Sequence, residues 1–211
     1  MRKSVSGRLI KSMLPEPIKK FIEIFSGLPS IGPRQATRLA FKLIAGGKNK
    51  IEEMSKAVSD LKNLKICSQC FFVHSNNNNL CGICGSAHRQ KNIIMLVEKE
   101  TDLISLEKPG VFKGRYLVLG ELSKTGVLDS AQKLRLNNLK SFIQKELNGQ
   151  AEEIIIAVNP TAYGDLQAMI IAKEFEGFAK KISRLGRGIP TGGEIEFADE
   201  ETLEQALQRR N

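Results

Sequence analysis

The four cysteines of this 211-residue chain form one block, CSQCFFVHSNNNNLCGIC, and no other feature constrains the fold as strongly. They make two C-x2-C pairs separated by ten residues: Cys67, Cys70, Cys81 and Cys84. Two such pairs present four thiolates to one cation in a tetrahedron, which is the ligand set typical of structural zinc. Four protein ligands leave no open position for a substrate. The block therefore predicts a zinc finger with one structural zinc ion per chain.

Two other interpretations of the cysteine block remain: disulfide bonds and an iron–sulfur cluster, which shares four-thiolate ligation. No run approaches the ~20 apolar residues of a membrane span, and residues 1–14 lack the apolar core of a signal peptide. We therefore expect a cytoplasmic protein with reduced thiols and no membrane partner, which disfavours disulfides. Because four cysteines are already present, we interpret His74 and His88 as loop residues without a special role.

A turn rich in glycine and proline, GLPSIGP, separates two helical patterns near the N-terminus. Apolar residues recur at helical spacing over residues 18–25. Pro33 suits the first position of a second helix, which we expect to run to about Ile44 before Gly46 and Gly47 end it. A third helix is expected over residues 51–65. Two helices joined by such a turn predict a helix-hairpin-helix.

The same turn has the chemistry of a phosphate site. We expect Gly32 to allow a sharp turn, with Leu28 and Ile31 packed inward, so that free amides at the helix start face outward. Arg34, Arg38 and Lys42 are four residues apart and share one helix face. An amide cradle beside a basic row predicts binding to DNA phosphates without readout of base sequence. The alternative is an ordinary helical hairpin with a solvated face.

The placement of charge supports a polyanionic partner. The net charge is +9, and residues 1–50 hold eleven Lys or Arg residues against two acids, which accounts for the whole excess. The other 161 residues are neutral overall. A basic block on a neutral chain is typical of nucleic-acid binding, although a solubilising surface has the same composition.

Beyond the cysteines the pattern changes to short apolar runs alternating with helical segments. The runs are residues 93–97, 116–120 and 154–158, and the helical patterns are residues 103–107, 130–147 and 166–180. Continuous apolar strands alternating with helices predict a parallel α/β layer. We divide the chain into a basic helical domain, a four-cysteine finger, an α/β domain and a C-terminal segment: residues 1–65, 66–88, 89–180 and 181–211.

Acidic residues near the predicted strand ends raise the question of catalysis. Glu98 directly follows the first strand, Asp102 comes four residues later, and Asp165 follows the third strand. Ligands of parallel sheets bind at these carboxyl ends. A metal-dependent phosphoryl-transfer site needs acids from a second strand end, where this chain has Asn159 and Thr161. The set is therefore short of carboxylates.

The order of these parts resembles the RecR family of bacterial recombination mediators. The resemblance rests on LPSIGPRQATRLAFKL, the four-cysteine block, VEKETDLISLE, AVNPTAYGD and above all GRGIPTGGEIEFADEETL, and it covers about residues 18–207. It implies a multi-part α/β fold: a helix-hairpin-helix, a zinc finger, a Toprim domain and a C-terminal segment that wraps onto the rest. It also implies that RecO and RecF work with the protein to place RecA on single-stranded gaps coated with single-strand-binding protein.

The resemblance also implies roles for individual residues. The DNA-contacting residues of the family correspond to Arg34 and Arg38, and the Toprim glutamate corresponds to Glu98. Toprim enzymes carry an Asp-x-Asp pair where this chain has Asn159 and Thr161, a loss that the family shares and that indicates a non-catalytic protein. The competing hypothesis is a metal-dependent nuclease or topoisomerase-like enzyme.

One hairpin supplies few phosphate contacts, so we expect a homo-oligomer. The resemblance implies a dimer or a ring-like tetramer that pairs through the hairpin region, where Phe25 and Phe41 are candidates for a shared face.

Overall fold

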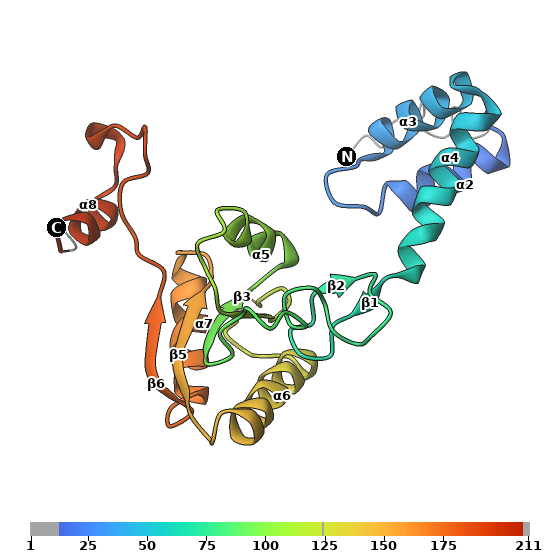
Figure 1. Cartoon of the computed structure of the whole chain (residues 1–211). Helices are drawn as coiled ribbons and strands as arrows, with labels where there is room; N and C mark the ends of the chain where they lie inside the picture. The colour runs from blue at the N-terminus through green and yellow to red at the C-terminus, as the bar shows by residue number, and fades with distance from the viewer. Residues whose placement is uncertain (1–12, 124, 209–211) are drawn as a thin grey trace. The chain divides into compact units, whose positions relative to one another are not determined.

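The computed structural model describes residues 13–123 and 125–208, and the chain divides into two compact units between Asn63 and Leu64 (Figure 1). Each unit is described by itself below. Within the described residues, none of the helices has the length and apolar character that crossing a membrane requires. The basic residues of positions 1–12, which contribute to the predicted basic block, lie outside the described part of the chain.

The first unit is helical, as predicted. It contains α2 (Glu16–Phe25), α3 (Pro33–Ala45), α4 (Gly47–Asp60) and the short 3-10 helix η1 (Leu61–Asn63). Pro33 occupies the first turn of α3, where its missing N–H removes no helical hydrogen bond. The third helix begins at Gly47, four residues earlier than its apolar pattern indicates, and it ends at Asp60 rather than residue 65.

The turn before α3 differs from the prediction in two details. Gly32 has an extended backbone with φ −87°, and the left-handed residue of the turn is Ser30, with φ 63°. The sharp turn that we assigned to Gly32 is therefore made two residues earlier. Leu28 remains 47% exposed instead of packing inward. The N–H of Ile31 donates to Leu28 O at 3.2 Å across this turn, in which Ser30 takes the conformation that glycine more often supplies.

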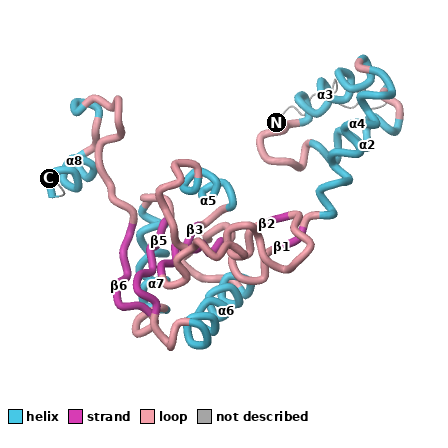
Figure 2. The backbone as a smooth tube through the Cα atoms, viewed as in Figure 1, coloured by secondary structure: helices cyan, strands magenta, loops and turns pink. Residues whose placement is uncertain are grey.

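The second unit begins with the finger and continues into a four-stranded parallel sheet (Figure 2). In the finger, β1 (Lys65–Ile66) pairs with β2 (Val73–His74) in antiparallel orientation. The sheet order is β4-β3-β5-β6, and all three pairings are parallel. Its strands are β3 (Ile93–Val97), β4 (Arg115–Val118), β5 (Ala151–Ala157) and β6 (Ala179–Arg184). The three predicted apolar strands and the α/β class are thus confirmed.

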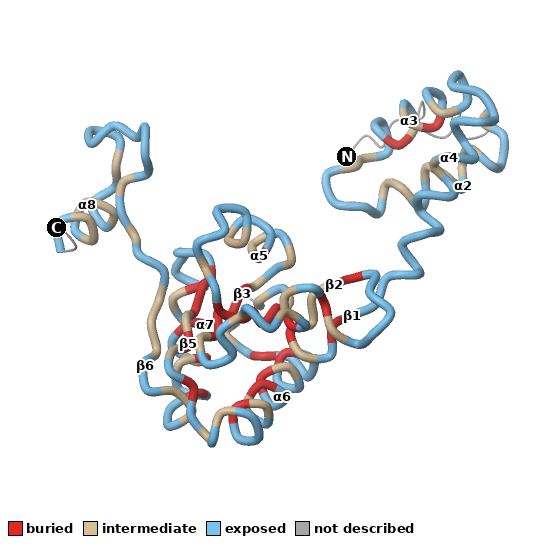
Figure 3. The backbone as a smooth tube through the Cα atoms, viewed as in Figure 1, coloured by how far each residue is buried: buried red, intermediate tan, exposed pale blue. Residues whose placement is uncertain are grey.

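Helices cover both faces of the sheet, and this explains why its strands read as continuous apolar runs. On one face, Ile94 and Leu96 pack with residues of α6 (Ser130–Glu146) and α7 (Ala162–Glu174). On the other, Met95 and Val97 pack with Leu103 of α5 (Glu100–Glu107). Figure 3 shows the buried backbone concentrated in this layer. The carboxyl ends of β3 and β5 lie side by side because the strands are parallel neighbours.

The C-terminal part differs from the sequence prediction. The helix predicted for residues 166–180 ends at Glu174, and a turn with Gly177 at φ 82° leads into β6. The boundary that we placed after residue 180 therefore falls inside a strand. β6 was missed because its sequence, AKKISR, is charged, as suits a strand at the sheet edge. The chain continues through the 3-10 helix η2 (Ile195–Phe197) to α8 (Glu200–Gln208).

Candidate functional site

The four cysteines converge into one buried cluster. Their Sγ atoms all lie within 4.8 Å of one another, and Cys70 Sγ lies 3.5 Å from Cys81 Sγ. All four cysteines are free, so the disulfide interpretation is not supported. Local turns position the thiols: the N–H of Cys67 donates to Phe72 O at 2.9 Å, and the N–H of Gly85 donates to Cys81 O at 2.9 Å.

The thiols of the cluster influence each other's ionisation. Hydrogen bonds from Cys70, Cys81 and Cys84 hold the pKa of Cys67 far below that of an ordinary thiol. Hydrogen bonds with Cys67, Cys70 and Cys81 raise the pKa of Cys84. A divalent cation bound here would replace the thiol protons and neutralise thiolates that otherwise repel one another.

The cluster has the dimensions of a four-thiolate metal site. Metal–sulfur bonds of about 2.3 Å in a tetrahedron give sulfur–sulfur edges of about 3.8 Å, close to the spacing found here. The cluster includes neither predicted loop histidine. His88 is exposed, and His74 accepts the N–H of Asn76 through Nδ1 at 3.2 Å. The four cysteines are therefore positioned to bind a metal ion without a histidine ligand.

The predicted DNA-binding side chains lie on the exposed face of α3. Arg34, Arg38 and Lys42 are exposed and belong to none of the ion pairs formed within residues 13–123 and 125–208. The opposite side of α3 buries Ala36 and Ala40. Successive positions on one helix face repeat at about four residues, so the three cations form one row. Their charges are available to an external anion.

Free amides lie beside this row. The first backbone bond of α3 runs from the N–H of Ala36 to Gly32 O at 3.0 Å, and no side chain caps the helix start. The N–H groups of Arg34 and Gln35 accordingly have no acceptor in the part of the chain that the structure describes. Such amides at the positive end of a helix dipole bind anions. The row and the amides together suit a phosphodiester backbone.

The three acidic residues near the strand ends do not form one site. Glu98 accepts the N–H of Leu122 at 3.2 Å and the side-chain amide of Asn159 at 3.3 Å. Asp102 accepts the N–H of Lys99 at 2.9 Å at the start of α5. Within the described residues, the cysteine cluster alone brings three or more potential metal ligands together. Glu98 and Asp102 instead fix the backbone around the end of β3.

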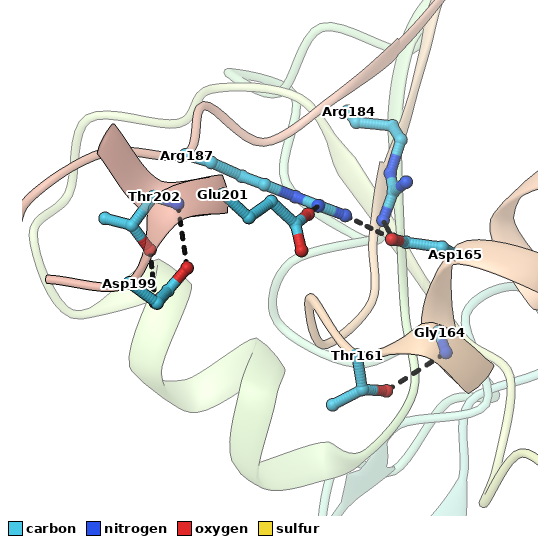
Figure 4. Close-up of polar contacts among 8 residues, drawn as sticks. All are labelled: Thr161, Gly164, Asp165, Arg184, Arg187, Asp199, Glu201 and Thr202. Carbon is cyan, nitrogen blue, oxygen red and sulfur yellow. Dashed lines mark hydrogen bonds and ion pairs between the residues drawn. The ribbon is translucent and has the colours of Figure 1, made fainter. Parts of the chain in front are cut away.

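Asp165 belongs to a different network, which the close-up in Figure 4 shows. Its Oδ1 accepts Nη2 of Arg184 at 2.6 Å and also pairs with Arg187. Arg187 donates through Nη1 to Glu201 at 2.6 Å. Hydrogen bonds from Arg184 and Arg187 hold the pKa of Asp165 below its usual range. Asp165 therefore attaches the C-terminal segment to α7, and its Oδ1 is occupied by two arginines.

Sequence reasoning missed three arginines. Arg184 and Arg187 sit 19 and 22 residues beyond Asp165, so no helical or strand spacing links them to it. Arg115 is buried at the first position of β4 and contacts the finger 31 and 46 residues earlier in the chain. The sequence signal for Arg115 was its place as a charged residue at the start of an otherwise apolar run, RYLVLG, which indicates a charge close to the core.

Comparison with known proteins agrees with this geometry. Family models match residues 18–62 (RecR, helix-hairpin-helix), 92–186 (Toprim domain) and 188–211 (RecR, C-terminal). Recombination protein RecR of Herpetosiphon aurantiacus is 36% identical over 201 residues, which is 94% of this chain and 96% of that protein. RecR of Dehalococcoides mccartyi is 37% identical over 195 residues, covering 92% and 93% of the two chains.

RecR of Staphylococcus aureus is 36% identical over 198 residues, or 93% of this chain and 97% of that protein. These similarities span both units and all three matched regions. They agree with the helical hairpin, the parallel sheet and the C-terminal segment described above. The chain therefore belongs to the RecR family of recombination proteins.

Proposed function

We propose that the protein is a non-catalytic DNA-binding mediator of recombinational repair. In this role it acts with RecO and RecF to load RecA on single-stranded gaps covered by single-strand-binding protein. The observation that carries the proposal is the row of Arg34, Arg38 and Lys42 beside the free amides of α3. These groups recognise phosphates and no base edges, so binding is independent of sequence. A gap-loading factor needs that independence because gaps arise anywhere in the genome.

A single hairpin binds weakly, and this supports an oligomeric assembly. Three phosphate contacts correspond to a shallow salt dependence and an affinity near ~10⁻⁴–10⁻⁶ M. Joining hairpins raises avidity by ~10²–10⁴-fold without a new contact. We propose a homo-oligomer, a dimer or a ring-like tetramer, that directs several hairpins at one DNA. The protein would act in the cytoplasm, at the nucleoid.

The surface of the helical unit supports that assembly. Within its described helices only two small residues, Ala36 and Ala40, are buried. Large apolar side chains stay exposed in the same unit, including Ile24 at 58%, Phe41 at 48% and Val58 at 57%. We propose that a partner covers these exposed apolar side chains. A second copy would supply the matching apolar surface, for which Phe41 is exposed, whereas Phe25 is half-buried and stacks on Phe21 with ring centroids 4.0 Å apart.

We further propose that the metal is one zinc ion per chain, held by Cys67, Cys70, Cys81 and Cys84. Zinc prefers four thiolates in a tetrahedron and does no redox chemistry there. The site would contribute folding free energy directly, since its ligands come from two separate C-x2-C pairs. The finger stabilises the second unit, to which it belongs by its contacts.

The decisive experiment is a band-shift series with single strands, duplexes and gapped duplexes, with and without RecO, across a range of salt concentrations. The variant replaces Arg34 and Arg38 by alanine. Its matched control replaces Lys56 and Lys62 of the same unit, both of which are exposed. We expect the arginine pair to weaken binding to all DNA sequences alike and to reduce the salt slope by roughly one unit per lost contact. An unchanged affinity and slope would contradict the proposal.

The enzyme hypothesis is tested in the same samples with Mg²⁺ or Mn²⁺ added. A shift without cleavage supports the mediator. Metal-dependent nicking that disappears in Glu98→Gln supports a Toprim nuclease instead, because Toprim enzymes use acids at the strand ends.

A further inference from the structure

Arg115 is a buried cation without a carboxylate partner. It opens strand β4, and only 7% of its surface is exposed. Among the ion pairs formed by residues 13–123 and 125–208, none includes Arg115. The guanidinium stays charged in proteins, and removing a charge from water costs several kcal/mol unless another charge compensates it. The environment of Arg115 should therefore contain a negative charge.

Every polar contact of this side chain leads to the finger. Nη1 donates to Oε1 of Gln69 at 2.6 Å, and Nη2 donates to the carbonyl of Cys84 at 3.2 Å. Gln69 lies between the first two cysteines and Cys84 is the last of the four, so one guanidinium holds both C-x2-C pairs. The ring of Phe142 covers it from α6, with its centroid 5.3 Å from Cζ.

The same side of the finger joins the backbone of β4. The N–H of Val118 donates to Cys70 O at 2.9 Å. β4 pairs with β3 on one side only, so this bond satisfies a donor on the free edge of the sheet. Arg115 and Val118 thus attach the finger to the two ends of a single edge strand.

The loaded finger supplies the missing charge. A divalent cation with four thiolates carries two net negative charges. Arg89, the next arginine beyond the cysteines, already has a carboxylate partner in Glu107, to which Nη1 donates at 3.1 Å. Arg115 has none among the described residues, and its hydrogen bonds to the side chain of Gln69 and the carbonyl of Cys84 bring its charge to one residue of each C-x2-C segment.

We propose that Arg115 is the counter-charge of the metal-loaded cysteine cluster and clamps both C-x2-C pairs to the edge of β4. Metal binding at the finger and stability of the parallel sheet are then coupled through one side chain. The proposal rests on metal binding by the four cysteines and goes beyond the proposed function, since it concerns neither DNA nor RecO. Arg115 acts here as a positioning residue.

The test compares the full-length parent with Arg115→Met, Arg115→Lys and the control Arg89→Met. Zinc per chain is measured first, because its absence from the parent would overturn the proposed cofactor itself. Zinc affinity is then measured by competition with a chromophoric chelator. We expect Arg115→Met to lose about 10–100-fold in affinity, as changes beside metal ligands do. Arg115→Lys keeps the charge and should recover part of that loss, whereas Arg89→Met should bind zinc as the parent does.

Unfolding temperatures with and without zinc distinguish a counter-charge role of Arg115 from a simple packing role. The two roles predict different signs for the effect of Arg115→Met on the metal-free protein. With zinc bound, Arg115→Met should unfold at a lower temperature than the parent. After chelation it should unfold at the same or a higher temperature, because an apolar side chain replaces a cation that has lost its compensating charge. Lower unfolding temperatures in both states, or a zinc affinity equal to that of the parent in Arg115→Met, would overturn the proposal.

A solution anion is the competing source of negative charge. A cavity of about 410 Å³ beside Arg115 is lined by Phe142, Ser68, Asn138, Lys145 and the exposed Glu146, which forms no ion pair with Arg115 among the described residues. Inorganic phosphate is therefore added to the zinc-loaded proteins. We expect phosphate to change the unfolding temperatures of the parent and of Arg115→Met by the same amount. Stabilisation of the zinc-loaded parent but not of Arg115→Met would identify a bound anion as the counter-charge and would overturn the proposal.

Discussion

Asn159 donates its side-chain amide to Oε2 of Glu98 at 3.3 Å, across the carboxyl ends of two neighbouring parallel strands. The other oxygen of Glu98 accepts the backbone N–H of Leu122 at 3.2 Å. One carboxylate therefore joins the end of β3, the end of β5 and the loop that follows β4. An asparagine here suits this joining role, since a second carboxylate would repel Glu98 unless a cation lay between them.

The first prediction concerns this carboxylate. Glu98→Gln should speed amide hydrogen exchange at Leu122 by about fivefold, because a charge-assisted bond of roughly 1 kcal/mol is weakened. DNA incubated with the parent or the variant and Mg²⁺ should remain uncut. Glu121→Gln, an exposed change in the same loop, is the control. Unchanged exchange at Leu122 in Glu98→Gln would show that the carboxylate does not hold the loop.

The second prediction concerns the cysteine cluster. Elemental analysis of the purified protein should give one zinc per chain, and Cys67→Ser should lose the zinc and unfold at a lower temperature than the parent. The affinity of the parent for zinc should also fall at low pH, because protons compete for the thiolates. His88→Ser, which changes an exposed residue beyond the cluster, should retain one zinc. A metal-free Cys67→Ser protein as stable as the parent would contradict a structural site.

The third prediction concerns the attachment of the C-terminal segment. Hydrogen bonds from Arg184 and then Arg187 lower the pKa of Asp165. A carboxyl with a lowered folded pKa stabilises the attachment fully above its unfolded value, roughly pH 4, and loses this effect as pH falls through the folded pKa. The attachment of the C-terminal segment to Asp165 should therefore be constant from about pH 7 to pH 5 and weaken below pH 4.

Amide exchange in α8 measures this attachment. At pH 7, Asp165→Asn should mimic acid and speed exchange by up to about fivefold, the range expected for partly exposed ion pairs. Glu196→Gln, an exposed change in the same segment, is the matched control and should have no effect. If Asp165→Asn exchanges at the rate of the parent, Arg187 does not anchor α8 through Asp165.

The fourth prediction concerns assembly. Phe41 is 48% exposed on α3, so a charge at this position would be buried at any interface that covers it. Phe41→Glu should reduce the mass measured by light scattering and weaken DNA binding, since avidity depends on joined hairpins. Val111→Glu, at a site 79% exposed in the second unit, should leave the mass unchanged. A strictly monomeric parent that binds DNA with full affinity would refute oligomerisation.

The parts of the fold that depend on local pattern were predictable. Pro33 at the start of α3, the four-cysteine cluster and the apolar strands β3 and β5 each follow from residue types at short spacing. β6 was not predictable in this way. It is an edge strand whose exposed lysines break the apolar run, and its pairing with β5 depends on residues about 28 positions earlier.

The site residues also divide into those set by local spacing and those set by contacts between distant segments. The row on α3 is a repeat of four residues and can be read from the sequence. The ion pairs of Asp165 and the contacts of Arg115 join segments far apart in the chain, so only the packed sheet brings them together. Without the fold, Asp165 therefore looked like a candidate for a catalytic set, and Arg115 fell just outside the strand predicted over residues 116–120.

The two edges of the sheet are protected by different means. β6 exposes Lys180 and Lys181, and such charges discourage another strand from pairing with an edge. β4 is buried along its whole length, and its edge donor at Val118 is satisfied by the finger. A chain that loses its metal and with it the finger would expose an apolar, unpaired strand that invites edge-to-edge aggregation. With zinc as the proposed metal, a shortage of zinc would then lead first to insoluble protein.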